Sequence, residues 1–368
     1  MKLRMISFLA GTALAGAATF AALTNAGAAD RGTLNVVSWG GAYTKSQIEA
    51  YHRPFEAANP ITINSIDYNG GIAEVKAQVD SGNVVWDVVD FEAADALRAC
   101  DEGLLEPIDV SALPAAPDGT SAADDFVTDA ANECWVATII FSTIVAYDAD
   151  RYGGNAPTKI EDFFDLQNFP GKRGLRRQNP KATLEMALMA DGVAPGDVYA
   201  MLATEEGLAR AFAKLDTIKD SVVWWEPGSQ PAQLLADGEV VMTTAYNGRI
   251  FNAMAMDGKP FNILWDGQIQ ELDVYSIVKG APNMEAAKAF LAFATSTGPL
   301  AAQASWIAYA PARRSSLPLV GNHAERGFPM MEHMPTANMQ GRALMIDNRW
   351  WADHQDDINE RWSAWLAN

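Results

Sequence analysis

The feature that most constrains the fold is the alternation of short β-branched apolar segments with helical segments. Residues 33–39 (Thr-Leu-Asn-Val-Val-Ser-Trp) have a strand pattern, which Gly40-Gly41 interrupts before a helical segment begins. The same order repeats from residue 61, and residues 84–91 and 93–102 supply a further strand and helix. Strands and helices that alternate over such lengths favour a parallel α/β sheet.

The rest of the chain continues this order. Residues 139–147 (Ile-Ile-Phe-Ser-Thr-Ile-Val-Ala-Tyr) are far too few for a membrane span, and their β-branched content predicts a strand buried on both faces. Further strands are predicted at 239–246, 261–265 and 272–278, and further helices at 184–190, 205–215, 284–296 and 355–366.

The N-terminus has the pattern of a secretory signal. Lys2 and Arg4 precede an uncharged stretch over residues 6–23, and the stretch closes on Ala26-Gly27-Ala28. We therefore expect residues 1–29 to be a signal peptide and the mature protein to be periplasmic.

The remaining length exceeds what one hydrophobic core usually supports, so two lobes are expected. We assign residues 30–142 and 274–306 to the first lobe, and residues 143–273 and 307–368 to the second. Because no flexible linker separates them, several strands should cross between the lobes as a hinge.

The formal net charge of −19 argues against binding to nucleic acid or to an anionic membrane. It favours cationic ligands mildly, or serves only to keep the protein soluble.

Catalytic and metal-binding patterns are missing from the sequence. There is no G-x-S-x-G, no H-E-x-x-H and no G-x-G-x-x-G after a strand. We therefore expect no enzyme activity, although isolated carboxylates could form a hydrolase pair. The four histidines are scattered, so neither a metal nor another cofactor is expected. The two cysteines, Cys100 and Cys134, should form a disulfide in an oxidising compartment.

Aromatic and acidic residues gather just after the predicted strands. In open α/β sheets ligands bind beyond the carboxyl ends of the strands. Aromatic faces attract alkylammonium groups, and carboxylates hold amines through charge-assisted hydrogen bonds. Core packing is the alternative role for each aromatic residue. The residues at the strand ends are Trp39, Tyr43, Glu92, Trp225, Glu226 and Tyr246, and they are joined by Asp273 within a predicted strand and by Tyr309 in the segment 307–311.

Several segments resemble the spermidine/putrescine-binding family of ABC transporter periplasmic proteins. The resemblance covers nearly the whole mature chain, and it depends on the order and spacing of the segments together. It implies a type II-like fold of two lobes, with mixed sheets flanked by helices and hinge crossover strands. It also implies a monomer that closes on its ligand and docks on permease subunits at the inner membrane. The segments are residues 38–43, 86–89, 102–109, 168–173, 184–188, 238–240, 245–248 and 272–273.

The resemblance also implies roles for particular residues. Trp39 and Tyr43 match the aromatic pair of the first loop, and Asp273 matches the acid that holds an amine. Tyr246 stands where an aromatic residue precedes Asn-Gly, and Tyr309 matches the tyrosine of the last hinge segment.

Other positions depart from the family pattern. Glu92 stands where polyamine binders have a short polar residue. Asn179 and Ala182 stand where they have an acidic pair, and Arg176-Arg177 comes just before. An arginine there could hold a carboxylate, while Asp273, Glu226 or Glu92 takes an amine.

These patterns predict a periplasmic receptor for a small amine, with a polyamine such as putrescine or spermidine as the main interpretation. A zwitterionic amino acid such as γ-aminobutyrate is the alternative, and a secreted enzyme is a third. The predicted ligand-binding residues are Trp39, Tyr43, Glu92, Arg177, Trp225, Glu226, Tyr246, Asp273 and Tyr309.

Overall fold

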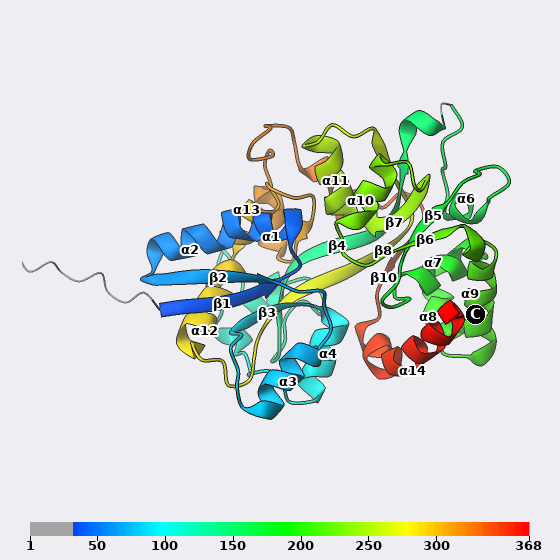
Figure 1. Ribbon diagram of the computed structural model, residues 1–368. Helices are drawn as coiled ribbons and strands as arrows, with labels where there is room; N and C mark the ends of the chain where they lie inside the picture. Colours follow the sequence, from blue (N-terminus) through cyan, green and yellow to red (C-terminus); the bar gives the residue numbers. More distant parts are fainter. Residues whose placement is uncertain (1–31, 153, 368) are drawn as a thin grey trace, which may run out of the picture. The chain divides into compact units, whose positions relative to one another are not determined.

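The computed structural model describes residues 32–152 and 154–367 (Figure 1). The expected signal peptide lies outside these residues. The strands are β1 (Gly32–Ser38), β2 (Ile61–Asp67), β3 (Val88–Glu92), β4 (Val136–Asp148), β5 (Arg173–Arg176), β6 (Val222–Trp225), β7 (Met242–Tyr246), β8 (Phe261–Ile277), β9 (Ala310–Pro311) and β10 (Ala343–Met345).

The α-helices alternate with these strands along most of the chain. A π-helical turn, Ile48–His52, joins the first two of them. They are α1 (Gly41–Gln47), α2 (Arg53–Ala58), α3 (Ala73–Ser81), α4 (Ala93–Asp101), α5 (Ala122–Asp125), α6 (Ile160–Phe164), α7 (Thr183–Ala190), α8 (Val198–Leu202), α9 (Glu205–Asp216), α10 (Gln230–Ala236), α11 (Asn247–Ala255), α12 (Met284–Ala294), α13 (Thr297–Gln303) and α14 (Asn348–Ala367).

The strands form one mixed sheet in the order β2-β1-β3-β8-β4-β7-β5-β6, with β9 beside β4 and β10 beside β8. At one end β1 runs parallel to β2 and β3, and at the other end β5 runs parallel to β6 and β7. The two long strands β4 and β8 pair antiparallel between these ends. Helices cover both faces of the sheet (Figure 1). The predicted mixed α/β fold with flanking helices is therefore confirmed.

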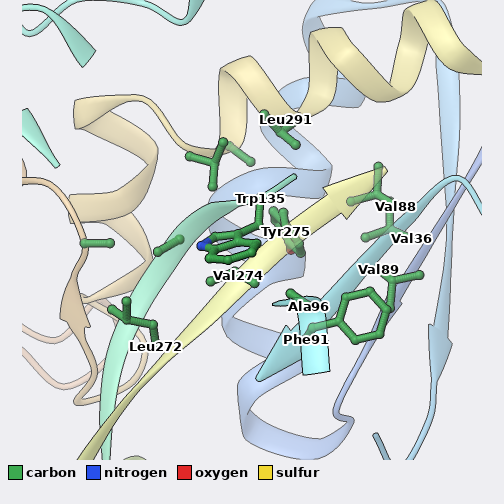
Figure 2. Close-up of a cluster of buried hydrophobic side chains, with 14 of the residues drawn as sticks. Val36, Val88, Val89, Phe91, Ala96, Trp135, Leu272, Val274, Tyr275 and Leu291 are labelled. Carbon is green, nitrogen blue, oxygen red and sulfur yellow. The ribbon is translucent and has the colours of Figure 1, made fainter. Parts of the chain in front are cut away.

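The first of two large buried clusters is built around β1, β3 and the C-terminal half of β8. Figure 2 shows Phe91, Trp135 and Val274 among its side chains. The disulfide between Cys100 and Cys134 adjoins this cluster and confirms the predicted pairing.

The second large cluster lies around α7, α9 and α14, with Leu188, Leu215 and Trp351 among its buried members. A smaller third cluster contains Trp225, and a fourth contains Tyr43 and Tyr309. The predicted lobe division stays a prediction, and the two large clusters group several residues differently from it. Residues 307–368 were assigned to the second lobe, whereas Ala308, Ala310, Ala312, Met330 and Met334 pack in the first cluster.

Several predicted boundaries differ from those of the structure, and two of the differences are large. The segments 261–265 and 272–278 were predicted as separate strands, but they belong to the single strand β8. Its polar middle pairs with β4 and β10, and Gln268 accepts a hydrogen bond from the Ser142 hydroxyl at 2.8 Å. Helix α14 begins at Asn348, seven residues before the predicted start at 355.

No helix of the described residues is both long and apolar enough to cross a membrane.

A buried carboxyl group holds α14 against α7. Trp351 Nε1 donates to Glu185 Oε1 at 2.6 Å, and the Tyr199 hydroxyl donates to the same oxygen at 3.1 Å. Burial raises the pKa of Glu185 to about 7, although these hydrogen bonds oppose the shift. Because this pKa is higher when folded than when unfolded, ionisation of Glu185 destabilises the folded state as pH rises from 4.5 to about 7.

We predict that Glu185→Gln, which resembles the protonated acid, stabilises the protein at pH 8 and has little effect at pH 4.5. The gain in the free energy of unfolding at pH 8 should be about 2 kcal/mol. Urea denaturation at both pH values measures it, with Glu74→Gln on the exposed surface of α3 as control. A gain that is equal at the two pH values would contradict the assignment.

Candidate ligand-binding site

A cavity of about 290 Å³ lies beyond the ends of the parallel strands. Trp39, Asp67 and Glu226 come from the ends of β1, β2 and β6, while Asp273 belongs to the crossing strand β8. Both parallel ends of the sheet therefore supply side chains to one cavity. Its lining residues are Trp39, Gly40, Gly41, Tyr43, Asp67, Tyr68, Asn69, Glu92, Phe141, Arg176, Glu226, Pro227, Gly228, Ser229, Tyr246, Arg249, Asp273 and Tyr309.

The turn after β1 requires glycine. Gly40 has a φ of 71°, in the left-handed region that other residues rarely adopt. A Cβ at this position would also lie 2.9 Å from Asp67 Oδ2. The close turn places the ring of Trp39 next to that of Tyr68, with centroids 4.9 Å apart.

Aromatic rings form much of the cavity wall. Tyr309 packs edge-on against Tyr43 at 5.6 Å and against Phe141 at 6.1 Å. Phe141 in turn contacts Tyr246 at 5.5 Å. Such faces suit the methylene chain and the ammonium group of an alkylamine.

Tyr43 is fixed by a buried carboxyl group behind the wall. Its hydroxyl donates to Asp90 Oδ2 at 2.9 Å, and Gln47 Nε2 donates to the same oxygen at 2.5 Å. Burial raises the pKa of Asp90 to about 7 against these hydrogen bonds. The negative charge that Asp90 can carry lies close enough to influence Asp273.

Asp273 is an acid of the cavity wall that is buried without a hydrogen-bond donor, within the described part of the chain, for one of its oxygens. Its side chain is buried, and its Oδ1 atom has no hydrogen-bond partner among the described residues. Burial and the neighbouring charges of Asp90, Glu92 and Glu271 raise the pKa of Asp273 well above its ordinary value. A buried carboxyl oxygen without a donor is costly, and a ligand cation would relieve that cost.

Arg249 supplies a positive charge from α11. Its Nη2 donates to the Trp39 carbonyl at 3.0 Å, and its Nη1 donates to the Gly40 carbonyl at 3.2 Å. No carboxylate of residues 32–152 or 154–367 lies within 4.0 Å of this guanidinium. Arg249 thus fixes the turn after β1 while its charge stays unpaired.

Glu92, Arg176, Lys181 and Glu271 form what we call the ion cluster. Arg176 Nη1 lies 3.0 Å from Glu92 Oε1, and Lys181 Nζ lies 2.5 Å from Glu92 Oε2 and 2.6 Å from Glu271 Oε2. Burial would raise the pKa of Glu92, but Lys181 and Arg176 outweigh it and lower this pKa to about 2. Burial would likewise lower the pKa of Lys181, but Glu271 and Glu92 outweigh it and raise that pKa.

Seven of the nine predicted ligand residues line the cavity, and Arg177 and Trp225 do not. Side chains alternate along a strand, so Arg176 at the end of β5 faces the cavity while the side chain of Arg177 is 54% exposed beside Glu226. Trp225 is buried in the third cluster, edge-on to Tyr246 at 5.8 Å. The seven are Trp39, Tyr43, Glu92, Glu226, Tyr246, Asp273 and Tyr309.

The sequence reasoning missed other lining residues. Asp67 ends β2, and Tyr68 and Asn69 follow it directly, so the same strand-end rule could have found them. Arg249 lies inside α11, three residues beyond Tyr246, and it carries no comparable signal. The described residues contain no group of three or more His, Cys, Asp or Glu side chains that could hold a metal ion.

A sheet with two parallel ends, joined by long crossing strands over one polar and aromatic cavity, is the architecture of a solute receptor. Residues 50–330 match the family of bacterial extracellular solute-binding proteins, and the chain belongs to this family. The gamma-aminobutyric acid-binding protein of Pseudomonas aeruginosa is 42% identical over 335 residues, which cover 91% of each chain.

Solved structures agree with this assignment. The binding protein MotA from A. tumefaciens B6, in complex with glucopine, has a TM-score of 0.80 and 33% identity over 91% of this chain and 99% of its own. The structure of a GABA receptor has a TM-score of 0.77 and 31% identity, over 91% of this chain and 97% of its own.

Proposed function

We propose that this protein is the periplasmic substrate-binding component of an ABC importer and that it captures a zwitterionic amino acid such as γ-aminobutyrate. The observation that carries the proposal is that one cavity holds an acid and a guanidinium without a partner of opposite charge among the described residues. Asp273 offers a buried carboxyl group whose Oδ1 has no donor there, and Arg249 offers a guanidinium without a carboxylate.

Asp273 is the acid best suited to the ligand ammonium. Glu92 is already paired with two cations, and the Glu226 side chain is 60% exposed, so water screens it. Asp273 is buried beside Tyr43 and Tyr309, whose rings can hold the alkyl chain.

Arg249 is the cation best suited to the ligand carboxylate. Arg176 lines the same cavity but already binds Glu92, whereas Arg249 donates only to backbone carbonyls within the part of the chain that the structure describes. A carboxylate placed against Arg249 would form charge-assisted hydrogen bonds in a site partly closed to water. The ligand would then lie between Asp273 and Arg249 with one charge at each end.

The relatives favour the zwitterion over a polyamine. The Pseudomonas aeruginosa protein and one of the solved structures are both named for γ-aminobutyrate. A polyamine has cationic groups only, so it would leave Arg249 without a counterion and place positive charge close to it. The polyamine interpretation is therefore the second candidate.

The crossing strands support capture by closure of two lobes. We place the first lobe around the first large cluster and the second around the other, with the segment that contains Ala308 and Met330 in the first. Arg249 on α11 would join the lobes through its bonds to Trp39 and Gly40. Ligand that bridges them would favour the closed form, which a permease recognises. In this proposal the protein is a monomer, has no cofactor and performs no catalysis.

We predict that the wild-type protein binds γ-aminobutyrate and that Arg249→Met weakens this binding roughly 30-fold, the equivalent of about 2 kcal/mol. Isothermal titration calorimetry measures the dissociation constants, with putrescine, spermidine and α-amino acids as competing ligands. Nuclear magnetic resonance of the recovered ligand tests whether it remains chemically unchanged.

Arg177→Met is the matched control, because it removes the adjacent exposed arginine outside the cavity. It should leave the dissociation constant within threefold of the wild-type value, roughly 0.6 kcal/mol. Equal losses in the two variants, or wild-type binding to putrescine and not to zwitterions, would contradict the proposal.

We also predict that binding releases a proton. Because burial and neighbouring acids raise the pKa of Asp273 in the free protein, an ammonium group must displace a proton from its protonated fraction. Affinity should therefore fall as pH falls through that raised pKa.

Calorimetry in phosphate and in Tris at the same pH measures the proton release from the difference in apparent enthalpy. Glu226→Gln is the control, because this acid lines the cavity from an exposed position, and it should release the same number of protons as wild type. Binding without proton release at any pH at which the protein stays folded would rule out Asp273 as the ammonium site.

A further inference from the structure

The ion cluster contains two cations and two carboxylates, so its formal charges cancel. Glu92 and Arg176 belong to the cavity lining, while Lys181 and Glu271 do not. All four side chains are 12% exposed or less. The cavity is therefore in contact with the oppositely charged pair Glu92 and Arg176. Lys181 and Glu271 form a second such pair behind it.

Both oxygens of Glu92 are engaged within the cluster. Oε1 accepts from Arg176 Nη1 at 3.0 Å, and Oε2 lies 2.5 Å from Lys181 Nζ. An incoming ammonium group finds no free carboxylate oxygen here, and the nearest exposed part of the pair is a guanidinium. A second amine that approaches Glu92 would therefore meet positive charge rather than negative charge.

Glu92 would otherwise be well placed to bind such an amine. It lies directly opposite Asp273 in the antiparallel pairing of β3 with β8, so the two acids project from the same face of the sheet. Two adjacent carboxylates in an aromatic cavity form a chemically suitable site for a diamine. Arg176 neutralises the charge of the second carboxylate, Glu92, on the side that faces the cavity.

We propose that Arg176 is a specificity-determining residue, which excludes diamines from the cavity by neutralising Glu92. This inference rests on the proposed function, because it assumes that Asp273 binds the first ammonium group. Without Arg176, the formal charge of the cluster would be −1, and Glu92 would share Lys181 with Glu271. A diamine could then place one ammonium at Asp273 and the other at Glu92.

The test compares Arg176→Met with the double variant Glu92→Gln/Arg176→Met. The single variant creates the uncompensated carboxylate and the double variant does not, although both remove the arginine side chain. We expect Arg176→Met to bind putrescine at least tenfold more tightly than wild type, by isothermal titration calorimetry. The double variant should bind it no more tightly than wild type.

Three results would overturn the inference. Equal gains in both variants would show that space, not charge, admits the diamine. No gain in Arg176→Met, or tight binding of putrescine by wild type, would show that Arg176 does not exclude it. Wild-type protein that binds no zwitterion contradicts the proposed function instead, so the two failures are distinguishable.

A second variant covers the case in which Arg176→Met folds poorly. Arg176→Gln keeps a hydrogen-bond donor for Glu92 but removes the charge. Putrescine should raise the Tm of this variant and leave that of Glu92→Gln/Arg176→Gln unchanged, because a ligand that binds only the folded state stabilises it. An absent rise in Arg176→Gln, or an equal rise in both, would overturn the inference.

Discussion

The antiparallel pairing of β4 with β8 is the interaction on which the rest of the structure depends. β8 pairs with β3 at the first parallel end of the sheet, and β4 pairs with β7 at the other. Residues that would otherwise belong to separate sheets therefore share one cavity. Asp273 illustrates this, since its strand pairs with both β3 and β4 where the cavity lies.

Charge balance in a buried space then determines what the cavity can accept. Four buried charges cancel within the ion cluster, and the pairing is necessary because an isolated buried charge is very costly. Asp273 and Arg249 have no such partners among residues 32–152 and 154–367. A ligand with one charge of each sign is the simplest way to satisfy both.

The sequence allowed prediction of those cavity residues that lie at the ends of strands, because the local alternation of strands and helices locates these ends. Trp39 and Glu226 lie at strand ends, which the alternation of elements locates. Arg177 was predicted as a ligand residue, but Arg176 lines the cavity, because a shift of one residue at the end of β5 reverses which side chain faces it.

The remaining residues could not be predicted for a different reason. Arg249 contacts the carbonyl of Gly40, 209 residues away, and only the tertiary fold brings them together. Lys181 and Glu271 are charged residues, which usually lie on the surface, and their pairing within the ion cluster makes burial possible. Similarly, the polar middle of β8 suggests a break between two strands. Only its pairing with β4 and β10 shows that the strand is continuous.

The most direct test of the central claim is a crystal structure of the protein with bound γ-aminobutyrate. We expect the ligand ammonium within hydrogen-bond distance of Asp273 Oδ1 and the ligand carboxylate against the guanidinium of Arg249. The Glu92–Arg176 pair should stay intact beside it. A ligand with its ammonium at Glu92 or its carboxylate on Arg176, and with Asp273 still unpartnered, would contradict the account.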